Sequence, residues 1–480
     1  MNRIRPWHLC GVLVALCLVA YSPLRENGFI DYDDENFITN NPHLIEGPTW
    51  SQICWAWTND EGPYWMPLTW LTLELDGWLS PTPSGDQPSP SPLVVHSQNL
   101  FWHAGSVLLL FGLCHRLTGS LWRSFLVAAL FDVHPMHVES VAWAIERKDV
   151  LMAFFGLVAL HAYLSYVRRP GWAPYLGMIV AFIASLLAKP MLITLPLLLL
   201  LLDFWPLRRL RLPASLQDGL AAPTHACVPA KQLIYEKIPL FTIALVCAIA
   251  AMNHRIVRSF DTFPLSARVM NAFTGYGWYL SATFYPSELG IFYPHPYRDW
   301  SWARALAGAG TLAVVTAVAL WQRHSRPWLI TGWMWFVLTM APVIGLTQGG
   351  AQAWADRFSY WPHIGLFVAV VWGLGGLVGS SRLSRCVCGG LCVLVLGCLV
   401  ALTRAQVGYW KDSIAAWEHA LAITTKNDFA HQRLSICYRR EGRNADAEYH
   451  LLEAVRIQRE RIPFPTQKGV TGRARSEPNP

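Results

Sequence analysis

Long apolar runs alternate with short polar segments along most of the chain. A membrane-spanning helix needs about 20 mainly apolar residues, and about 17 are enough in places. Runs of this kind predict about eleven spanning helices, at 6–24, 95–115, 120–134, 148–167, 173–188, 191–206, 236–252, 303–321, 328–346, 362–379 and 387–403. The pattern predicts an all-α protein that crosses a membrane many times.

Arginine positions predict how these helices are oriented. Lys and Arg concentrate in the cytoplasmic loops of membrane proteins, and Arg3 and Arg5 place the N-terminus on that side. Further arginines fall on the same side in alternate loops: Arg116, Arg123, Arg168, Arg169, Arg208, Arg209, Arg211, Arg323, Arg326, Arg382 and Arg385. This holds only if the run at 270–286 does not cross, so we expect that run to be re-entrant or interfacial. A further span is the alternative.

The predicted orientation leaves several segments outside, namely 25–94, 135–147, 189–190, 253–302, 347–361 and the chain after 404. The membrane is then the cytoplasmic membrane of a bacterium, with a periplasmic C-terminus, or the endoplasmic reticulum membrane of a eukaryote. Membrane lipid is therefore an expected partner.

Composition supports a membrane protein and argues against a nucleic-acid partner. Only 14% of the residues are charged, whereas soluble domains carry about 25%. The net charge of +7 comes from short Lys and Arg clusters between apolar runs, which form no basic face. Most cysteines, such as Cys10 and Cys17, lie inside apolar runs, where a free thiol is expected to behave as a small hydrophobe.

The chain changes character after a membrane domain at 1–404. Helices are predicted at 410–424, 429–440 and 444–458, and a tetratricopeptide-like spacing joins Leu434, Tyr438, Gly442, Ala447 and Ala454. About three repeats are needed for independent stability, and this tail, 405–462, is shorter. We therefore expect it to dock on the membrane domain or on a partner, with 463–480 disordered.

The acidic residues after the first span are the first candidates for chemistry. Ionisable groups near membrane depth are costly and so suggest function. Asp33 and Asp34 are adjacent, and neighbouring carboxylates raise each other's pKa, so that one can act as a base near neutral pH. A solvated acidic loop or a helix cap is the alternative. A divalent metal held with Glu35 is another; no other cofactor is predicted.

A second candidate group lies at His134, His137 and Glu139. Two histidines and a glutamate could bind zinc, but Pro135 interrupts helical geometry and the spacing matches no closed zinc site. We expect these side chains to line a polar pocket that orients donor or acceptor, and interfacial packing is the alternative.

Cationic residues form a third group. Lys189 and Arg357 suit a clamp for the phosphate of a lipid-linked donor, and Arg147, beside Lys148 and Asp149, is a weaker candidate of the same kind. Lys189 could instead extend to the membrane interface, and Asp356 could form a local pair with Arg357. Gly-rich phosphate loops and nucleotide fingerprints are absent from the sequence, which favours a donor held in the bilayer.

Several stretches together carry a family resemblance: Tyr32-Asp33-Asp34-Glu35, Asn40-Asn41-Pro42, Pro67-Leu68-Thr69, Leu130-Phe131-Asp132-Val133-His134-Pro135-Met136-His137-Val138-Glu139-Ser140, Lys148-Asp149-Val150-Leu151, Ala188-Lys189-Pro190 and Asp356-Arg357-Phe358-Ser359-Tyr360-Trp361-Pro362. With these stretches and its tail, the chain resembles the transmembrane and tetratricopeptide-repeat-containing (TMTC-like) O-mannosyltransferases and their bacterial relatives. That family lies within the GT-C superfamily of glycosyltransferases.

The resemblance implies a GT-C fold, a polyprenyl- or dolichyl-phosphate sugar donor and a protein Ser/Thr hydroxyl as acceptor. Asp33 and Asp34 match the acidic pair of the first external loop, and Glu139 matches the second acidic position. The chain departs from eukaryotic members in its short tail and in Lys189-Pro190, where they have Lys-Glu. The sugar, mannose or another hexose, and the acceptor, protein or glycan, therefore stay open.

The sequence thus predicts an inverting membrane glycosyltransferase. Asp33 or Asp34 takes the acceptor's proton, Lys189 and Arg357 hold the donor phosphate, and Glu139 and His137 orient the acceptor or the base. A non-catalytic scaffold with an interaction tail and a lipid-linked sugar transporter are the alternatives. Transport would favour charges at the membrane midplane, whereas this chain places its charges at one face.

Overall fold

The structure is a computed structural model that describes residues 5–45, 47–59, 65–80, 89–210, 227–254, 264–296, 300–347, 349–376 and 381–461. Helices and turns make up these residues, and no β-sheet occurs among them. The expected disordered segment 463–480 lies outside the described residues, as do Arg3 and Arg211.

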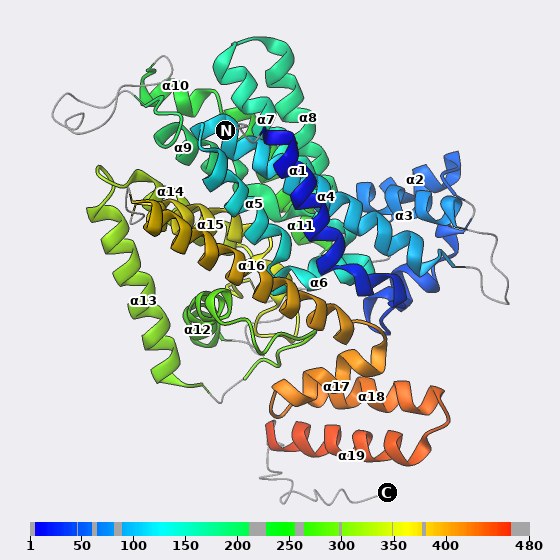
Figure 1. Cartoon of the computed structure of the whole chain (residues 1–480). Helices are drawn as coiled ribbons and strands as arrows, with labels where there is room; N and C mark the ends of the chain where they lie inside the picture. The colour runs from blue at the N-terminus through cyan, green and yellow to red at the C-terminus, as the bar shows by residue number, and fades with distance from the viewer. Residues whose placement is uncertain are drawn as a thin grey trace, which may run out of the picture.

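A bundle of apolar helices forms most of the molecule (Figure 1). Its members are α1 (Pro6–Ala20), α4 (Pro92–Thr118), α5 (Leu121–Val133), α7 (Arg147–Arg168), α8 (Trp172–Ala188), α9 (Leu195–Phe204), α11 (Ile238–His254), α12 (Leu265–Phe284), α13 (Trp302–Trp321), α14 (Pro327–Met340), α15 (Pro362–Gly375) and α16 (Arg382–Tyr409). Each expected span corresponds to one of these helices, which confirms the all-α fold.

Four helices of the described chain are long and apolar enough to cross a membrane, by length and composition: Pro92–Thr118, Ala144–Arg168, Trp302–Trp321 and Arg382–Tyr409. Shorter apolar helices account for most of the other expected spans. α5, with 13 residues, is not among them, so the count of eleven spans stays a prediction. α5 packs against α1, α4, α15 and α16.

The run expected to be re-entrant or interfacial forms α12, a helix of 20 residues. Figure 1 shows α12 along its axis, whereas α13 and α16 are seen from the side. α12 packs closely on α13: a Cβ on Gly308 would lie 2.0 Å from the backbone oxygen of Phe273. Small residues permit such close approach between membrane helices. Whether α12 crosses the bilayer stays a prediction.

Short helices connect the bundle and shape its polar end. The first loop contains η1 (Ser22–Glu26), η2 (Glu35–Thr39), η3 (Pro42–Leu44), α2 (Trp50–Thr58) and α3 (Pro67–Leu79). Later connections contain η4 (Pro135–His137), α6 (Val138–Ala142), η5 (Ala144–Glu146), η6 (Pro190–Thr194), α10 (Ala230–Tyr235) and η8 (Asp356–Ser359).

The tail forms three helices, α17 (Ser413–Ile423), α18 (Asp428–Arg440) and α19 (Asn444–Arg461), stacked beyond the end of α16 (Figure 1). Trp417, Leu434 and Tyr438 are buried in the same hydrophobic cluster as the bundle helices. The tail therefore shares the bundle's core, as its small number of repeats requires.

Candidate functional site

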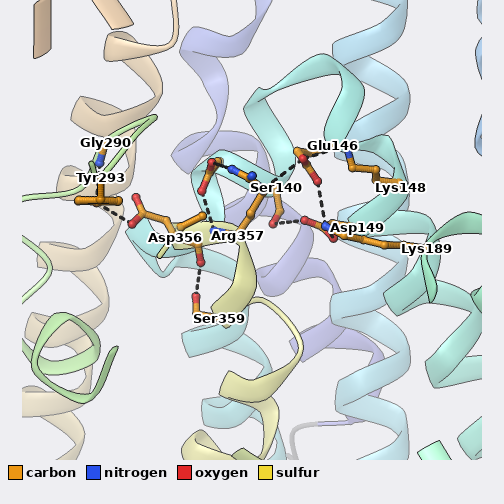
Figure 2. Close-up of polar contacts among 12 residues, drawn as sticks. Ser140, Glu146, Lys148, Asp149, Lys189, Gly290, Tyr293, Asp356, Arg357 and Ser359 are labelled. Carbon is orange, nitrogen blue, oxygen red and sulfur yellow. Dashed lines mark hydrogen bonds and ion pairs between the residues drawn. The ribbon is translucent and has the colours of Figure 1, made fainter. Parts of the chain in front are cut away.

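Buried charges gather where η5, the start of α7, the end of α8 and η8 meet (Figure 2). Glu146 is at their centre, with a side chain 2% exposed. Its carboxylate lies 3.0 Å from Lys148 Nζ, 3.1 Å from Lys189 Nζ and 3.3 Å from Arg357 Nε. We call Lys148, Lys189 and Arg357 the cation cluster. Fixed cations at such a buried place require anionic partners.

Two residues explain how Lys189 reaches this position. Pro190 disfavours helical geometry in the residue before it, so α8 ends and Lys189 adopts an extended backbone. Its Nζ then lies 2.5 Å from Asp149 Oδ1 as well as near Glu146. Thr69 of α3 donates a hydrogen bond to the Ala188 carbonyl at 3.1 Å, which fixes the end of α8.

Arg357 joins η8 to α6. Its backbone N–H donates to Glu139 Oε2 at 2.7 Å, and its guanidinium forms an ion pair with the same carboxylate. The guanidinium also lies over the ring of Trp143, 5.2 Å from its centroid, a favourable cation–π arrangement. Burial raises the pKa of the Glu139 carboxyl, although Arg357 opposes the shift. Glu139 thus holds Arg357 in the cluster.

The two adjacent aspartates have different environments. Asp34 is fully buried and accepts hydrogen bonds from the backbone N–H groups of Ile30 and Ile145, both at 3.0 Å. Burial outweighs these bonds and raises the pKa of Asp34 to about 7. Both carboxylate oxygens are therefore engaged in anchoring the first loop to η5. The catalytic assignment of Asp34 stays a prediction.

Asp33 is only partly buried, and its carboxylate makes no hydrogen bond within the described chain. It interacts electrostatically with Lys148 and Arg357, and these cations oppose the upward shift that burial gives the pKa of its carboxyl. Asp33 is thus an uncommitted carboxylate beside the cation cluster.

The tail contributes to the position of this acidic loop. Ser413 Oγ accepts a hydrogen bond from the Asp31 N–H at 2.7 Å. Arg440 of α18 bridges the carboxylates of Asp31 and Glu35, at 2.8 and 2.7 Å. The ring of Tyr32 stacks on Trp143 and meets the edges of tail aromatics, Trp417 and Phe429. The loop that carries Asp33 is therefore held between the bundle and the tail.

Asp356 lies outside the cation cluster. Its Oδ1 accepts a hydrogen bond from the Tyr293 hydroxyl at 2.7 Å (Figure 2), and the Ser359 hydroxyl donates to its backbone carbonyl at 2.7 Å. Burial raises the pKa of the Asp356 carboxyl well above its usual range. Asp356 therefore ties η8 to the segment before α13 while its neighbour Arg357 enters the cluster.

The two histidines proposed for substrate binding contact protein groups instead. His134 Nε2 lies 2.9 Å from the Thr283 carbonyl. His137 binds the Phe131 carbonyl at 2.7 Å through Nδ1 and His363 at 2.9 Å through Nε2. Both rings are buried. They connect η4 to α12 and α15, and Glu139, the third ligand of the zinc alternative, is engaged with Arg357.

Arg147 points away from the cluster, which corrects its expected place in a phosphate clamp. Its guanidinium is fully buried, 2.6 Å from Asp76 of α3 and 2.8 Å from the Val95 carbonyl. Successive helical residues point about 100° apart, so Arg147 faces α3 and α4 while Lys148 faces Glu146. Arg147 thus holds the first loop to the bundle.

Sequence reasoning missed Glu146 as a site residue and gave Lys148 and Asp149 little weight. The available signal was the run Glu146-Arg147-Lys148-Asp149, four ionisable residues directly before an apolar span. Such a run is costly at the membrane boundary unless its charges are paired. Which members face the site depends on the turn between η5 and α7.

Comparison with known proteins identifies several similar proteins that carry the same description. No family model and no solved structure matches the chain. Tmtc2 of Drosophila melanogaster is 28% identical over 34% of this chain, and human TMTC4 is 28% identical over 33%. Mouse TMTC1 is 31% identical over 32%. All three are named protein O-mannosyl-transferases.

This chain is similar to the protein O-mannosyl-transferases. The aligned part amounts to 17%, 23% and 16% of those three relatives, so the chain spans less than a quarter of their length in each match. The similarity to O-mannosyl-transferases supports a glycosyltransferase role for the chain, and the apolar helices agree with a membrane protein.

Proposed function

We propose that this protein transfers a hexose, mannose first among the candidates, from a polyprenyl- or dolichyl-phosphate donor to a Ser or Thr hydroxyl of a protein. The observation that carries the proposal is the cation cluster with the uncommitted Asp33 carboxylate beside it. The pairing of buried cations with an available carboxylate suits a reaction in which a phosphate leaves and a hydroxyl attacks.

The cation cluster would receive the donor phosphate. Lys189 and Arg357 keep 15% and 12% of their side chains exposed, so both can be reached from solvent. Lys148 is more buried, with 6% of its side chain exposed. Its positive charge would add to the electrostatic attraction for the phosphate without direct contact. Preorganised cations stabilise the charge that develops on a leaving phosphate. The lipid tail would lie among the outer halves of the spans.

Asp33 would act as the base. It removes the proton of the acceptor hydroxyl while the hydroxyl oxygen forms a bond to the anomeric carbon. The bond from that carbon to the phosphate oxygen breaks, and the phosphate leaves with the electron pair, so the configuration inverts. Asp34 keeps the loop on η5, and Glu139 keeps Arg357 in place.

The decisive experiment measures transfer of labelled mannose from polyprenyl-phosphate mannose to a Ser/Thr-containing acceptor peptide, in membranes that contain equal amounts of each variant. We expect Asp33→Asn to lower the rate by about 10²-fold or more, the range of general-base effects. Asp446→Asn, at a half-exposed tail position where the carboxylate pairs with Arg443, is the matched control and should leave the rate unchanged.

A wild-type rate in Asp33→Asn would refute the base assignment. Wild-type protein that binds the donor but transfers no sugar to any acceptor would favour a lipid-linked sugar transporter. Wild-type protein that does not bind the donor would favour a scaffold.

A further inference from the structure

A second polar cluster lies inside the bundle, apart from the cation cluster. It consists of Cys17 on α1, His103 on α4 and Asp132 on α5, and all three side chains are buried. The sulfur, a ring nitrogen and a carboxylate oxygen lie within 4.8 Å of one another. These residues come from three different helices and converge on one point.

Buried polar atoms without partners mark this place. Neither carboxylate oxygen of Asp132 has a hydrogen-bond partner within the described chain, and neither does the Tyr21 hydroxyl beside it. His103 Nε2 lies 3.5 Å from Asp132 Oδ1, and the Cys17 thiol also interacts with this carboxylate. Buried polar groups are nearly always satisfied, because an unmade bond costs about 1–3 kcal/mol. A bound ion that these atoms contact would therefore satisfy them.

Both ring nitrogens of His103 contact polar groups at this cluster. Its Nδ1 lies 2.7 Å from the Tyr360 hydroxyl, and its Nε2 lies 3.1 Å from the Asp132 carbonyl. Metal-binding histidines usually have their second ring nitrogen fixed by such a neighbour. Because a carbonyl oxygen can only accept, Nε2 carries the ring proton in this arrangement. Metal binding through Nε2 therefore requires the other tautomer, in which Nδ1–H donates to the Tyr360 hydroxyl.

We propose that Cys17 Sγ, His103 Nε2 and the Asp132 carboxylate bind a zinc ion. Thiolate and imidazole ligands select zinc over magnesium or calcium, and tetrahedral zinc holds its ligand atoms about 3.3–3.8 Å apart, so a small inward movement closes the site. A thiolate and a carboxylate together balance the charge of Zn²⁺, as the apolar interior requires. Binding releases the thiol proton to solvent.

The zinc ion would have a structural role. Cys17 lies near the end of α1, which leads into the acidic loop, and Asp132 lies near the end of α5, which leads into η4 and α6. Tyr360 directly follows η8. One ion would therefore tie together the three segments that carry Asp33, Glu139 and Arg357, and this inference does not depend on the proposed reaction.

The test measures zinc per polypeptide by elemental mass spectrometry on the full chain purified in detergent. We expect about one zinc per chain in the wild type and a large loss in Cys17→Ser and Asp132→Asn. Cys114→Ser is the matched control, because Cys114 is also a buried thiol of the bundle outside the cluster, and it should retain zinc. A zinc chelator should lower the thermal unfolding temperature of the wild type, and added Zn²⁺ should restore it.

The wild type alone keeps the inference testable if the variants fail to fold. Wild-type protein that contains no zinc and takes up none when titrated with Zn²⁺ would overturn the proposal. Zinc retained at wild-type level in folded Cys17→Ser would overturn it as well.

Discussion

Two charge networks lie at opposite ends of α7, and they differ in whether charged groups remain accessible to a ligand. The cation cluster lies at the start of the helix. The distal network, defined as Tyr163, Asp203, Arg209, Glu236 and Lys237, lies about 22 Å further along at 1.5 Å per residue. Both are buried and rich in ion pairs, so burial of charge alone does not identify the site.

The distal network is closed. Lys237 Nζ lies 2.5 Å from Asp203 Oδ2, and Arg209 lies 3.1 Å from Asp203 and 3.0 Å from Glu236. The Tyr163 hydroxyl donates to Asp203 at 2.5 Å. Asp203 and Lys237 each expose only 1% of their side chains, and Arg209 and Glu236 expose 8% and 11%. Two cations balance two carboxylates, and the arrangement joins α7, α9 and the start of α11.

The cation cluster is open by contrast. Lys189 and Arg357 can be reached from solvent, and Asp33 adds a carboxylate that makes no hydrogen bond in the described chain. A ligand can therefore bind without breaking every ion pair. The comparison indicates which features distinguish a candidate catalytic site from a charge network that only stabilises the fold. They are cations that solvent can reach and a carboxylate without a hydrogen-bond partner in the described chain.

The largest expected effect is a loss of folding stability on substitution in the distal network. Asp203→Asn leaves the buried Lys237 with only Glu236, 3.4 Å away, as a charged partner, and breaking a buried pair costs about 3–5 kcal/mol. Thermal unfolding in detergent should show a clear drop. Transfer per folded molecule should stay near the wild-type value, and a selective loss of transfer would contradict the division between the two networks.

Arg357→Gln should lower sugar transfer by about 10²–10³-fold, the range for loss of one electrostatic donor. The variant also leaves Glu139 buried without its ion-pair partner, so some stability is lost. Arg357→Lys keeps the charge and should recover part of the rate. The comparison is to be made at equal amounts of folded protein, and equal rates in Arg357→Gln and wild type would reject the phosphate role.

Asp34 should make stability depend on pH. Its pKa is raised to about 7 in the folded protein from an ordinary value near 3.9, so the folded state binds this proton more tightly than the unfolded chain. Stability is then lost as the pH rises from about 4 through about 7. Asp34→Asn removes this dependence, and thermal unfolding at about pH 5 and about pH 8 should differ less than in the wild type. An unchanged difference would show that Asp34 does not titrate in this range.

Arg440→Gln should have the smallest effect on stability, below about 1 kcal/mol, because more than half of its side chain is exposed and such ion pairs contribute little. It should nevertheless slow transfer several-fold by loosening the loop that carries Asp33. The rate assay used for Asp33→Asn measures this. Arg456→Gln, at another exposed tail arginine, provides the control and should not slow transfer.

The apolar pattern was enough to predict the helices, since long runs can satisfy their backbone within a membrane only as helices. The pattern of arginines predicted that Asp33, Lys189 and Arg357 share one face. It could not predict that Arg147 and Lys148 point to different partners, because that depends on the turn between η5 and α7. Nor could it distinguish Asp33 from Asp34, because the distinction depends on backbone donors from Ile30 and Ile145.

The packing of Tyr32 against both Trp143 and Trp417 has a practical consequence for work with fragments. A version of the protein cut after Tyr409 would keep every apolar helix of the bundle, yet it would strip one side of the Tyr32 ring and remove Arg440 from Asp31 and Glu35. The acidic loop after α1 and the tail helices therefore pack as one structural unit. A membrane domain produced without α17 and α18 would therefore lack the contacts that the tail makes to its acidic loop.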